Sequence, residues 1–470
     1  MSEFQGKLIG VIGAAATGRA AAPALAGLGA RVRVYDERTA EALGETICQI
    51  APYAELFLGD AHYSGIEECD LIVPSPGVWA DAPVLRAAVE RGTPVLSEIE
   101  IAYRISQAPI IAITGTNGKT TTVMMVADIL RADGRQVQVA GNTLAGGFQV
   151  PLIQAAATLP GNAWIVAEIS SFQLEWVQRF RPRVAIITNI TADHLNRHGT
   201  VAAYTEAKAR LLDAQTEADW RVLNRENEAT RELMARGSGH LLQFGRERHS
   251  EEGAWAEQVA GRRWLRARLS GRELDLLPVD QLKVPGEHTL ENALAAAVAG
   301  LAVGCQPEAI AAGLAEFKGV ADRLEYVCQI DGVDYVNNTM CTNVDAAVRS
   351  IEAYDRGVVL IAGGKGKGLD FEPLGRAIAE RVKALVAIGD DGPEIAESAR
   401  RHGFERISRA TSMAEAVQQA AAVAEAGDVV LLAPACASFD WYSSFEARGQ
   451  DFKQAVNRLA SEEKTMKADA

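Results

Sequence analysis

The chain has 470 residues, of which 48% are hydrophobic and 23% are charged, and its formal net charge is -14. This length predicts about three domains, and the composition is typical of a soluble globular protein. The negative charge argues against a nucleic-acid partner or an anionic membrane surface, since both favour basic proteins.

The N-terminal residues, MSEFQGKLIGVIG, enter a predicted strand at once and lack the basic and long apolar regions of a signal peptide. The longest apolar stretch, 292–305, is too short to span a bilayer. Six cysteines are scattered without a CxxC pair, which predicts free thiols in a reducing compartment. We therefore expect a cytoplasmic protein with no membrane association, and a monomer.

The first block of the chain, 1–106, alternates short β-branched runs with Ala-rich helical stretches. Strands are predicted at 8–13, 31–36 and 70–75. The sequence GAAATG at 13–18 is a degenerate GxGxxG with Ala15 in place of the middle glycine. With Asp36 at the end of the next strand, it would by itself weakly indicate a dinucleotide site and a nicotinamide-dependent dehydrogenase.

The second and third blocks, 107–320 and 321–470, continue the alternation. Strands are predicted at 108–115, 163–170 and 183–190, and then at 358–364, 384–389 and 428–435. The stretch 237–285 is charged and broken by Gly and Pro, which predicts small antiparallel strands appended to the second block. The fold class expected is α/β with three domains: a Rossmann-like N-terminal domain, a P-loop-type central ATPase domain and a Rossmann-like C-terminal domain.

The strongest local signal is a strand, a glycine-containing turn, a Lys-Thr pair and a helix, in that order. The loop residues are Gly115, Thr116, Asn117, Gly118, Lys119, Thr120 and Thr121. Glycines let backbone N–H groups approach phosphate oxygens, and the helix presents its N-terminus to the anion. Lys119 can bridge the β- and γ-phosphates of ATP, and the Thr120 hydroxyl can bind Mg²⁺. The spacing GxxGKT is shorter than the standard GxxxxGKT.

Several segments in one order resemble the Mur ligase family over nearly the whole chain. They are TGTNGKTT at 114–121, EISSFQLE at 168–175, NITADHLNRHG at 189–199, YTEAKARLL at 204–212, PGEHTLENALAA at 285–296, GGKGKGLDF at 363–371 and PACASFDWYSSFEARG at 434–449. The set is most similar to the branch that adds D-glutamate to UDP-N-acetylmuramoyl-L-alanine. The resemblance implies an ATP- and Mg²⁺-dependent ligase of peptidoglycan precursor synthesis that forms an acyl phosphate, with UDP-N-acetylmuramoyl-L-alanine and glutamate as its substrates.

The resemblance also implies a metal site. Glu168 and His194, which follow predicted strands, are implied Mg²⁺ ligands, together with Thr120 and with Lys208 after carbamoylation. Carbamoylation would turn a cation into an anionic oxygen ligand that suits magnesium. His194 and His198 have a spacing seen in zinc sites, but Leu195 stands where the zinc motif requires Glu, so zinc is not expected.

The remaining implied contacts fall into three groups. The nucleotide is expected at Asn142, Asn292, Arg323 and Asn338. The UDP-sugar is expected at Thr17, Asp36, Ser75, Pro76 and Gly77. The carboxylates of the incoming amino acid are expected at Thr342, Lys367, Ser438 and Phe445, because one cation with hydroxyls suits a dicarboxylate.

One motif departs from the family pattern. The family usually has Asp-Ser-Lys-Ala-Thr-Asn, whereas this chain has Asn338-Thr339-Met340-Cys341-Thr342-Asn343, and Asp322 replaces a residue that is usually His. The departure leaves other readings open: a related ligase with changed specificity, such as L-glutamate addition or folate polyglutamation, or a non-catalytic regulator that binds UDP-sugar or ATP. The dehydrogenase alternative does not explain residues 110–121 and 168–199.

Overall fold

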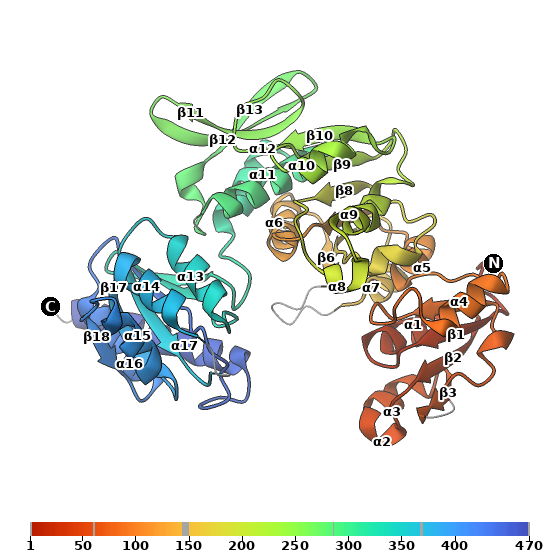
Figure 1. The fold of residues 1–470 in the computed structure, drawn as a ribbon. Coiled ribbons are helices and arrows are strands. Elements are labelled where there is room, and N and C mark those ends of the chain that lie inside the picture. The colour runs from red at the N-terminus through yellow and green to blue at the C-terminus, as the bar shows by residue number, and fades with distance from the viewer. Residues whose placement is uncertain (1, 60–61, 143–149, 285, 367–369, 469–470) are drawn as a thin grey trace. The chain divides into compact units, whose positions relative to one another are not determined.

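The structure is a computed structural model that describes residues 2–59, 62–142, 150–284, 286–366 and 370–468 (Figure 1). The chain divides into two compact units, Met1–Gln281 with Leu290–Ala315 and Leu282–Thr289 with Glu316–Ala470. Along the part of the chain that the structure describes, no helix combines the length and the apolar character needed to cross a membrane.

The first unit opens with a parallel sheet in the order β3-β2-β1-β4. Its elements are β1 (Leu8–Ile12), α1 (Ala16–Gly27), β2 (Arg31–Asp36), α2 (Ala40–Leu43), α3 (Thr46–Ile50), β3 (Glu55–Leu58), β4 (Leu71–Pro74), α4 (Pro83–Glu90) and α5 (Glu98–Ile105). Every residue of β1 and β4 is buried, as expected for strands of a parallel sheet that is covered on both faces. The three strands predicted from sequence for this block are confirmed.

A nine-stranded sheet follows in the same unit, in the order β13-β12-β11-β10-β9-β8-β5-β7-β6. Its parallel part and the associated helices are β5 (Ile110–Thr114), α6 (Lys119–Ala132), β6 (Val137–Gly141), α7 (Leu152–Thr158), β7 (Trp164–Glu168), β8 (Val184–Ile187), α8 (Leu195–His198), α9 (Val201–Ala209), β9 (Trp220–Asn224), α10 (Glu228–Glu232), β10 (His240–Phe244), α11 (Glu287–Ala302) and α12 (Pro307–Glu316). The carboxyl ends of β5, β7 and β8 lie at one edge, where ligands of such sheets bind.

Three antiparallel strands extend this sheet: β11 (Gly253–Val259), β12 (Arg262–Leu269) and β13 (Arg272–Pro278). The expectation of antiparallel strands within 237–285 is right for these three. It is wrong for β10, which pairs parallel with β9. The short helix α10 carries the chain back across the sheet, so β10 continues the preceding strand–helix–strand pattern.

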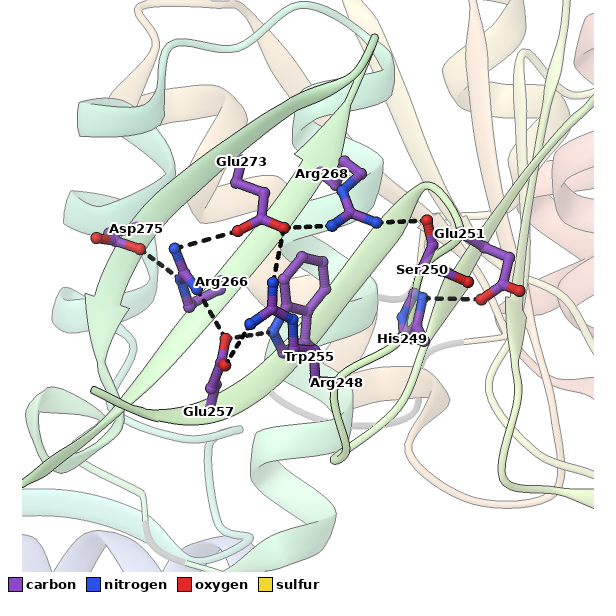
Figure 2. A network of polar contacts seen from close by, with 10 residues as sticks. All are labelled: Arg248, His249, Ser250, Glu251, Trp255, Glu257, Arg266, Arg268, Glu273 and Asp275. Carbon is purple, nitrogen blue, oxygen red and sulfur yellow. Dashed lines mark hydrogen bonds and ion pairs between the residues drawn. The ribbon is translucent and has the colours of Figure 1, made fainter.

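A network of charged side chains covers one face of these strands (Figure 2). Arg266 donates to Glu257 over 2.7 Å and forms an ion pair with Glu273 over 3.4 Å. Arg248 reaches the same two carboxylates over 2.8 and 3.2 Å. Arg268 also binds Glu273. Positive and negative charges are thus paired across neighbouring strands, which favours the register observed.

The second unit contains a six-stranded sheet in the order β14-β15-β19-β16-β17-β18. Its elements are β14 (Glu325–Ile330), β15 (Val333–Asn337), α13 (Val344–Glu352), β16 (Val358–Gly363), α14 (Glu372–Arg381), β17 (Val382–Ile388), α15 (Gly392–Arg401), β18 (Ile407–Arg409), α16 (Met413–Val423), β19 (Val429–Leu432) and α17 (Phe445–Ala468). All pairs are parallel except β14 with β15. Each of the three expected domains therefore has its own sheet, while their limits at 106/107 and 320/321 stay predictions.

Candidate active site

The predicted phosphate loop joins buried β5 to α6. Gly115 has a φ of +151°, and a Cβ built on it would lie 1.9 Å from Thr188 Oγ1. Gly118 has a φ of +79°, and its Cβ would lie 2.2 Å from Asn292 Oδ1. Both positions therefore require glycine for their conformation and for the lack of a side chain. The two glycines expected to admit phosphate are also the places where β8 and α11 approach the loop.

Neighbouring side chains hold the backbone of this loop. The Thr116 N–H donates to the Asn189 carbonyl over 2.8 Å, and the Asn117 N–H donates to Asn189 Oδ1 over 2.9 Å. The Thr188 hydroxyl donates to the Asn117 carbonyl over 2.6 Å. Lys119 Nζ donates to the Thr116 carbonyl over 2.9 Å, so its ammonium lies over the loop. These bonds fix the loop in one conformation with a lysine above it, and such a loop at a helix N-terminus suits a polyphosphate.

A hydroxyl and a carboxylate meet beside the start of α6. The Thr120 hydroxyl donates to Glu168 Oε2 over 2.6 Å, and Glu168 at the end of β7 is 4% exposed. The Asn142 N–H donates to the Glu168 carbonyl over 2.9 Å, which brings the end of β6 to the same place. Thr121, in the first turn of α6, is half-buried. The structure thus brings Thr120, Glu168 and Asn142 together as expected from the sequence.

Lys208 is buried beneath the phosphate loop. Its Nζ donates to the Gly115 carbonyl over 2.8 Å and to Thr114 Oγ1 over 3.3 Å, and it lies 4.5 Å from the centre of the Tyr204 ring. Burial, with a further contribution from the Lys119 charge, lowers the pKa of Lys208 to about 7. A large fraction of this amine is therefore neutral and nucleophilic near neutral pH, which carbamoylation by carbon dioxide requires.

His194 is an exposed residue, in contrast to buried Glu168 and Lys208. It has a φ of +50°, its ring packs edge-on against Phe172 at 4.9 Å, and its side chain is 48% exposed. The His198 ring stacks against Phe172 at 5.6 Å and contacts the Ser171 hydroxyl at 3.0 Å. Burial lowers the pKa of His198. The His198 ring is thus held by contacts within the protein, whereas the exposed His194 ring is available to a ligand.

The loop Ser75–Gly77 is anchored by an arginine that the sequence reading did not single out. Arg197 donates to the Pro76 carbonyl over 2.7 Å and to the Val78 carbonyl over 2.8 Å. The same guanidinium binds Glu175 over 3.0 and 2.6 Å. Arg197 lies within 189–199, one of the segments that resemble the Mur ligase family. Its partners are distant in the sequence, so residue spacing alone does not predict its contacts.

The other predicted UDP-sugar contacts lie at the ends of β1, β2 and β4. Thr17 is buried in the first turn of α1. Asp36 accepts the Ala14 N–H over 2.7 Å and binds Arg38 through two hydrogen bonds of 2.8 Å. Burial acts to raise the pKa of the Asp36 carboxyl, but Arg38 and the Ala14 N–H outweigh it and hold the pKa at about 2. Asp36 is therefore an ionised carboxylate that fixes the glycine-containing turn.

In the second unit, a buried arginine organises the predicted amino-acid site. Arg448 is 1% exposed and donates to the carbonyls of Thr339, Cys436 and Ala437 over 3.0, 3.1 and 3.3 Å. The Thr339 hydroxyl accepts Arg448 Nε over 3.0 Å and donates to the Phe445 carbonyl over 2.8 Å. Burial lowers the pKa of Arg448 to about 10. The sequence reading missed this residue, since only the tertiary fold reveals its partners.

Three of the four predicted amino-acid contacts lie in the part of the chain that the structure describes. Ser438 is 2% exposed and follows Ala437, Phe445 begins α17, and Thr342 is half-buried shortly after Thr339. Lys367 lies outside the described residues. The Phe445 carbonyl is thus held by Thr339, and the carbonyl of Ala437, next to Ser438, is held by Arg448.

The predicted nucleotide contacts are distributed over both units. In the first unit, Asn292 is 6% exposed and its Oδ1 accepts the Thr122 hydroxyl over 3.3 Å. In the second unit, Arg323 lies in a tight turn, and Asn338 is 5% exposed with its amide bonded to Leu324 and Ser350.

Comparison with known proteins assigns three segments of the chain to domain families. Residues 7–97 match the model of the Mur ligase MurD-like N-terminal domain, 113–300 the Mur ligase middle domain and 322–436 the Mur ligase glutamate ligase domain. The chain belongs to the Mur ligase family, and the predicted three-domain α/β fold class is confirmed.

Full-length relatives narrow the comparison within the family. The chain is 43% identical to the UDP-N-acetylmuramoylalanine–D-glutamate ligase of Pelotomaculum thermopropionicum, covering 98% of this chain and 99% of the relative. It is 39% identical to the ligase of the same name from Koribacter versatilis, covering 98% and 100%.

Solved structures with the same fold are more distant in sequence. UDP-N-acetylmuramate–alanine ligase MurC from Thermotoga maritima has a TM-score of 0.55 at 20% identity, covering 97% of this chain and all of that one. MurF from Acinetobacter baumannii has a TM-score of 0.57 at 20% identity, covering 88% of each chain. These likenesses support the fold.

Proposed function

We propose that the chain is an ATP-dependent ligase that adds D-glutamate to UDP-N-acetylmuramoyl-L-alanine in the cytoplasmic synthesis of peptidoglycan precursors. Identity of 43% over nearly the full length to a ligase of that name supports this function. The observation in the structure that carries it is the loop at 115–120, with Lys119 above the loop and the Thr120–Glu168 pair beside it.

ATP is the proposed occupant of this loop. The loop N–H groups and Lys119 would hold its phosphates in line with the attacking carboxylate of the muramoyl-alanine substrate. Attack of the carboxylate oxygen on the γ-phosphorus forms an acyl phosphate through a new O–P bond and breaks the bond to ADP. The neutral amine of glutamate then attacks the acyl carbon, and phosphate leaves as the amide forms. No covalent enzyme intermediate is needed.

Mg²⁺ fits the donors that these residues offer. Thr120 supplies a hydroxyl, Glu168 a carboxylate and carbamoylated Lys208 further oxygens, and hard oxygen ligands are those that magnesium prefers. Among the described residues no group of three or more His, Cys, Asp or Glu side chains could hold a metal ion. When bound, the ion would offset the charge that develops on the phosphates.

The UDP-sugar and glutamate are proposed to bind through the remaining predicted residues. Thr17, Asp36 and the loop 75–77 would contact the UDP-sugar, and Thr342, Lys367, Ser438 and Phe445 would contact glutamate. Asn142, Asn292, Arg323 and Asn338 are proposed nucleotide contacts. The three domains are proposed to span 1–106, 107–320 and 321–470.

The decisive experiment is phosphate release with D- and L-glutamate supplied separately. We expect release that requires ATP, UDP-N-acetylmuramoyl-L-alanine and D-glutamate together, and loss of turnover in Lys119→Ala. The exposed lysine variant Lys7→Ala is the matched control and should behave as the unmodified protein. Turnover with L-glutamate alone would overturn the proposed specificity, and full activity of Lys119→Ala would overturn the role of the loop.

A further inference from the structure

Arg323 lies between two residues with unusual backbone conformations. Asp322 has a φ of +64° and Leu324 a φ of +44°, and neither is glycine. Left-handed conformations are unfavourable for such residues, and they persist only where the surrounding contacts enforce them. The Arg323 N–H donates to the Val320 carbonyl over 2.9 Å, which closes a tight turn. The direction in which the Arg323 side chain leaves the backbone therefore depends on both neighbours.

Two consecutive asparagines at the end of β15 hold these two neighbours. Asn337 Nδ2 donates to Asp322 Oδ1 over 2.9 Å, and Asn337 is fully buried. Asn338 Oδ1 accepts the Leu324 N–H over 3.2 Å. Asn338 Nδ2 donates to Ser350 Oγ over 2.7 Å. Asn338 thus uses both ends of its amide, one on the turn and one on α13.

Further contacts within the second unit hold Asp322 in place. Asp322 accepts the Met340 N–H at its carbonyl over 3.0 Å, and its N–H donates to Glu325 Oε2 over 2.9 Å. A Cβ at Gly449 of α17 would lie 2.4 Å from Asp322 Oδ1, so glycine lets the helix approach. These contacts fix Asp322 independently of Asn338. The Leu324 N–H, in contrast, donates its hydrogen bond to the side chain of Asn338.

We propose that Asn337 and Asn338 form a clip that holds Asp322 and Leu324 in left-handed conformations and so orients Arg323 for ATP. The inference rests on the proposed contact of Arg323 with the nucleotide. On this proposal Asn338 is a positioning residue that acts through Leu324, in place of the direct nucleotide contact proposed for it above, such as a hydrogen bond to the ribose. This role also accounts for an amide at 338, where the family usually has a carboxylate.

Two variants separate the clip from a direct ribose contact. Asn338→Ala removes the acceptor of the Leu324 N–H, and we expect KM for ATP to rise about tenfold with little change in kcat or in KM for the other substrates. Leu324→Gly in the same chain should return KM for ATP to within about threefold of the original, because glycine adopts a positive φ readily. A lost ribose contact would not be restored by glycine at 324. Failure of this rescue would therefore overturn the proposal.

A structural readout tests the clip without turnover. Amide hydrogen exchange of the peptide spanning 320–326 should be faster in Asn338→Ala, while Asn457→Ala, an exposed site on α17, should leave it unchanged. Unchanged exchange in Asn338→Ala would overturn the clip, whatever reaction the protein catalyses. Absence of ADP formation by the unmodified protein would instead contradict the proposed function, so the two failures are distinguishable.

Discussion

The Lys208 ammonium donates a hydrogen bond of 2.8 Å to the carbonyl of Gly115, the first glycine of the phosphate loop. A lysine on a helix is normally solvated, and this one is 1% exposed. The bond therefore ties α9 to the loop and keeps a reactive amine next to the proposed metal site.

Replacement of Lys208 should remove activity in a way that a small acid can restore. Lys208→Ala leaves a cavity and removes the source of a carbamate, so we expect kcat to fall by roughly a hundredfold or more. Acetate or formate at high concentration should recover part of the loss, because a carboxylate supplies the missing anionic oxygens. Chloride at equal ionic strength is the control. Undiminished activity of Lys208→Ala would contradict the proposed carbamate.

Gly118 and Gly134 form a matched pair for testing the loop. Both have a positive φ, +79° and +75°, but a Cβ at Gly134 meets nothing within 4 Å. Gly134→Ala should lower the free energy of unfolding by about 1–2 kcal/mol, the cost of a left-handed backbone conformation for a residue with a Cβ. Gly118→Ala should in addition displace Asn292 and abolish ATP binding, measured by calorimetry. Equal ATP affinity of the two variants would show that the close approach of Asn292 has no role.

Glu98 should make stability fall as pH rises. Burial raises the pKa of the Glu98 carboxyl to about 7, and its Oε1 accepts the Ile153 N–H over 2.5 Å. The unfolded chain loses this proton at lower pH than the folded chain, so stability decreases between about pH 4.5 and 7. Relative to the unmodified protein, Glu98→Gln should gain roughly 2–3 kcal/mol across this window. Denaturation at pH 5 and pH 8 checks this, and parallel pH profiles of the two proteins would contradict it.

Arg197 should control affinity for the UDP-sugar. It binds two carbonyls of the loop after β4 and the Glu175 carboxylate with one planar guanidinium. Lysine keeps the charge but cannot make this set of bonds. We expect Arg197→Lys to raise KM for UDP-N-acetylmuramoyl-L-alanine about tenfold, with KM for ATP unchanged. Arg210→Lys, at a nearby site that binds the Glu175 carbonyl, is the control. An equal change in both KM values would show that the loop is not the affected element.

The elements around the site were predictable because their signals are local. A buried strand, two glycines and a Lys-Thr pair determine the loop at 115–120, and the observed strand and helix ends agree within a residue or two. The structure also brings Thr120 next to Glu168, two residues that the resemblance implies as ligands of one metal ion.

The residues that hold the site together were not predictable. Arg197, Arg448 and Asn337 each bind partners that are distant in sequence or backbone atoms that carry no sequence signal. The burial of Lys208 was not predicted, because its helix has no clear apolar face and the resemblance implied only its role as a carbamoylated metal ligand. Parallel β10 was missed since its charged surroundings resemble those of an antiparallel appendage.

The paired charges on β11–β13 have a consequence for self-association. β13 is the last strand of its sheet, and an unprotected last strand can pair with a second molecule and start aggregation. Glu273 and Asp275 on this strand each form an ion pair with Arg266 (Figure 2). The pairing of β12 with β13 also shifts register between Leu265 and Arg266. A strand from a second molecule that approached β13 would therefore meet charged side chains and an irregular backbone. The same contacts that set the strand register therefore discourage intermolecular sheet growth at this edge of the sheet.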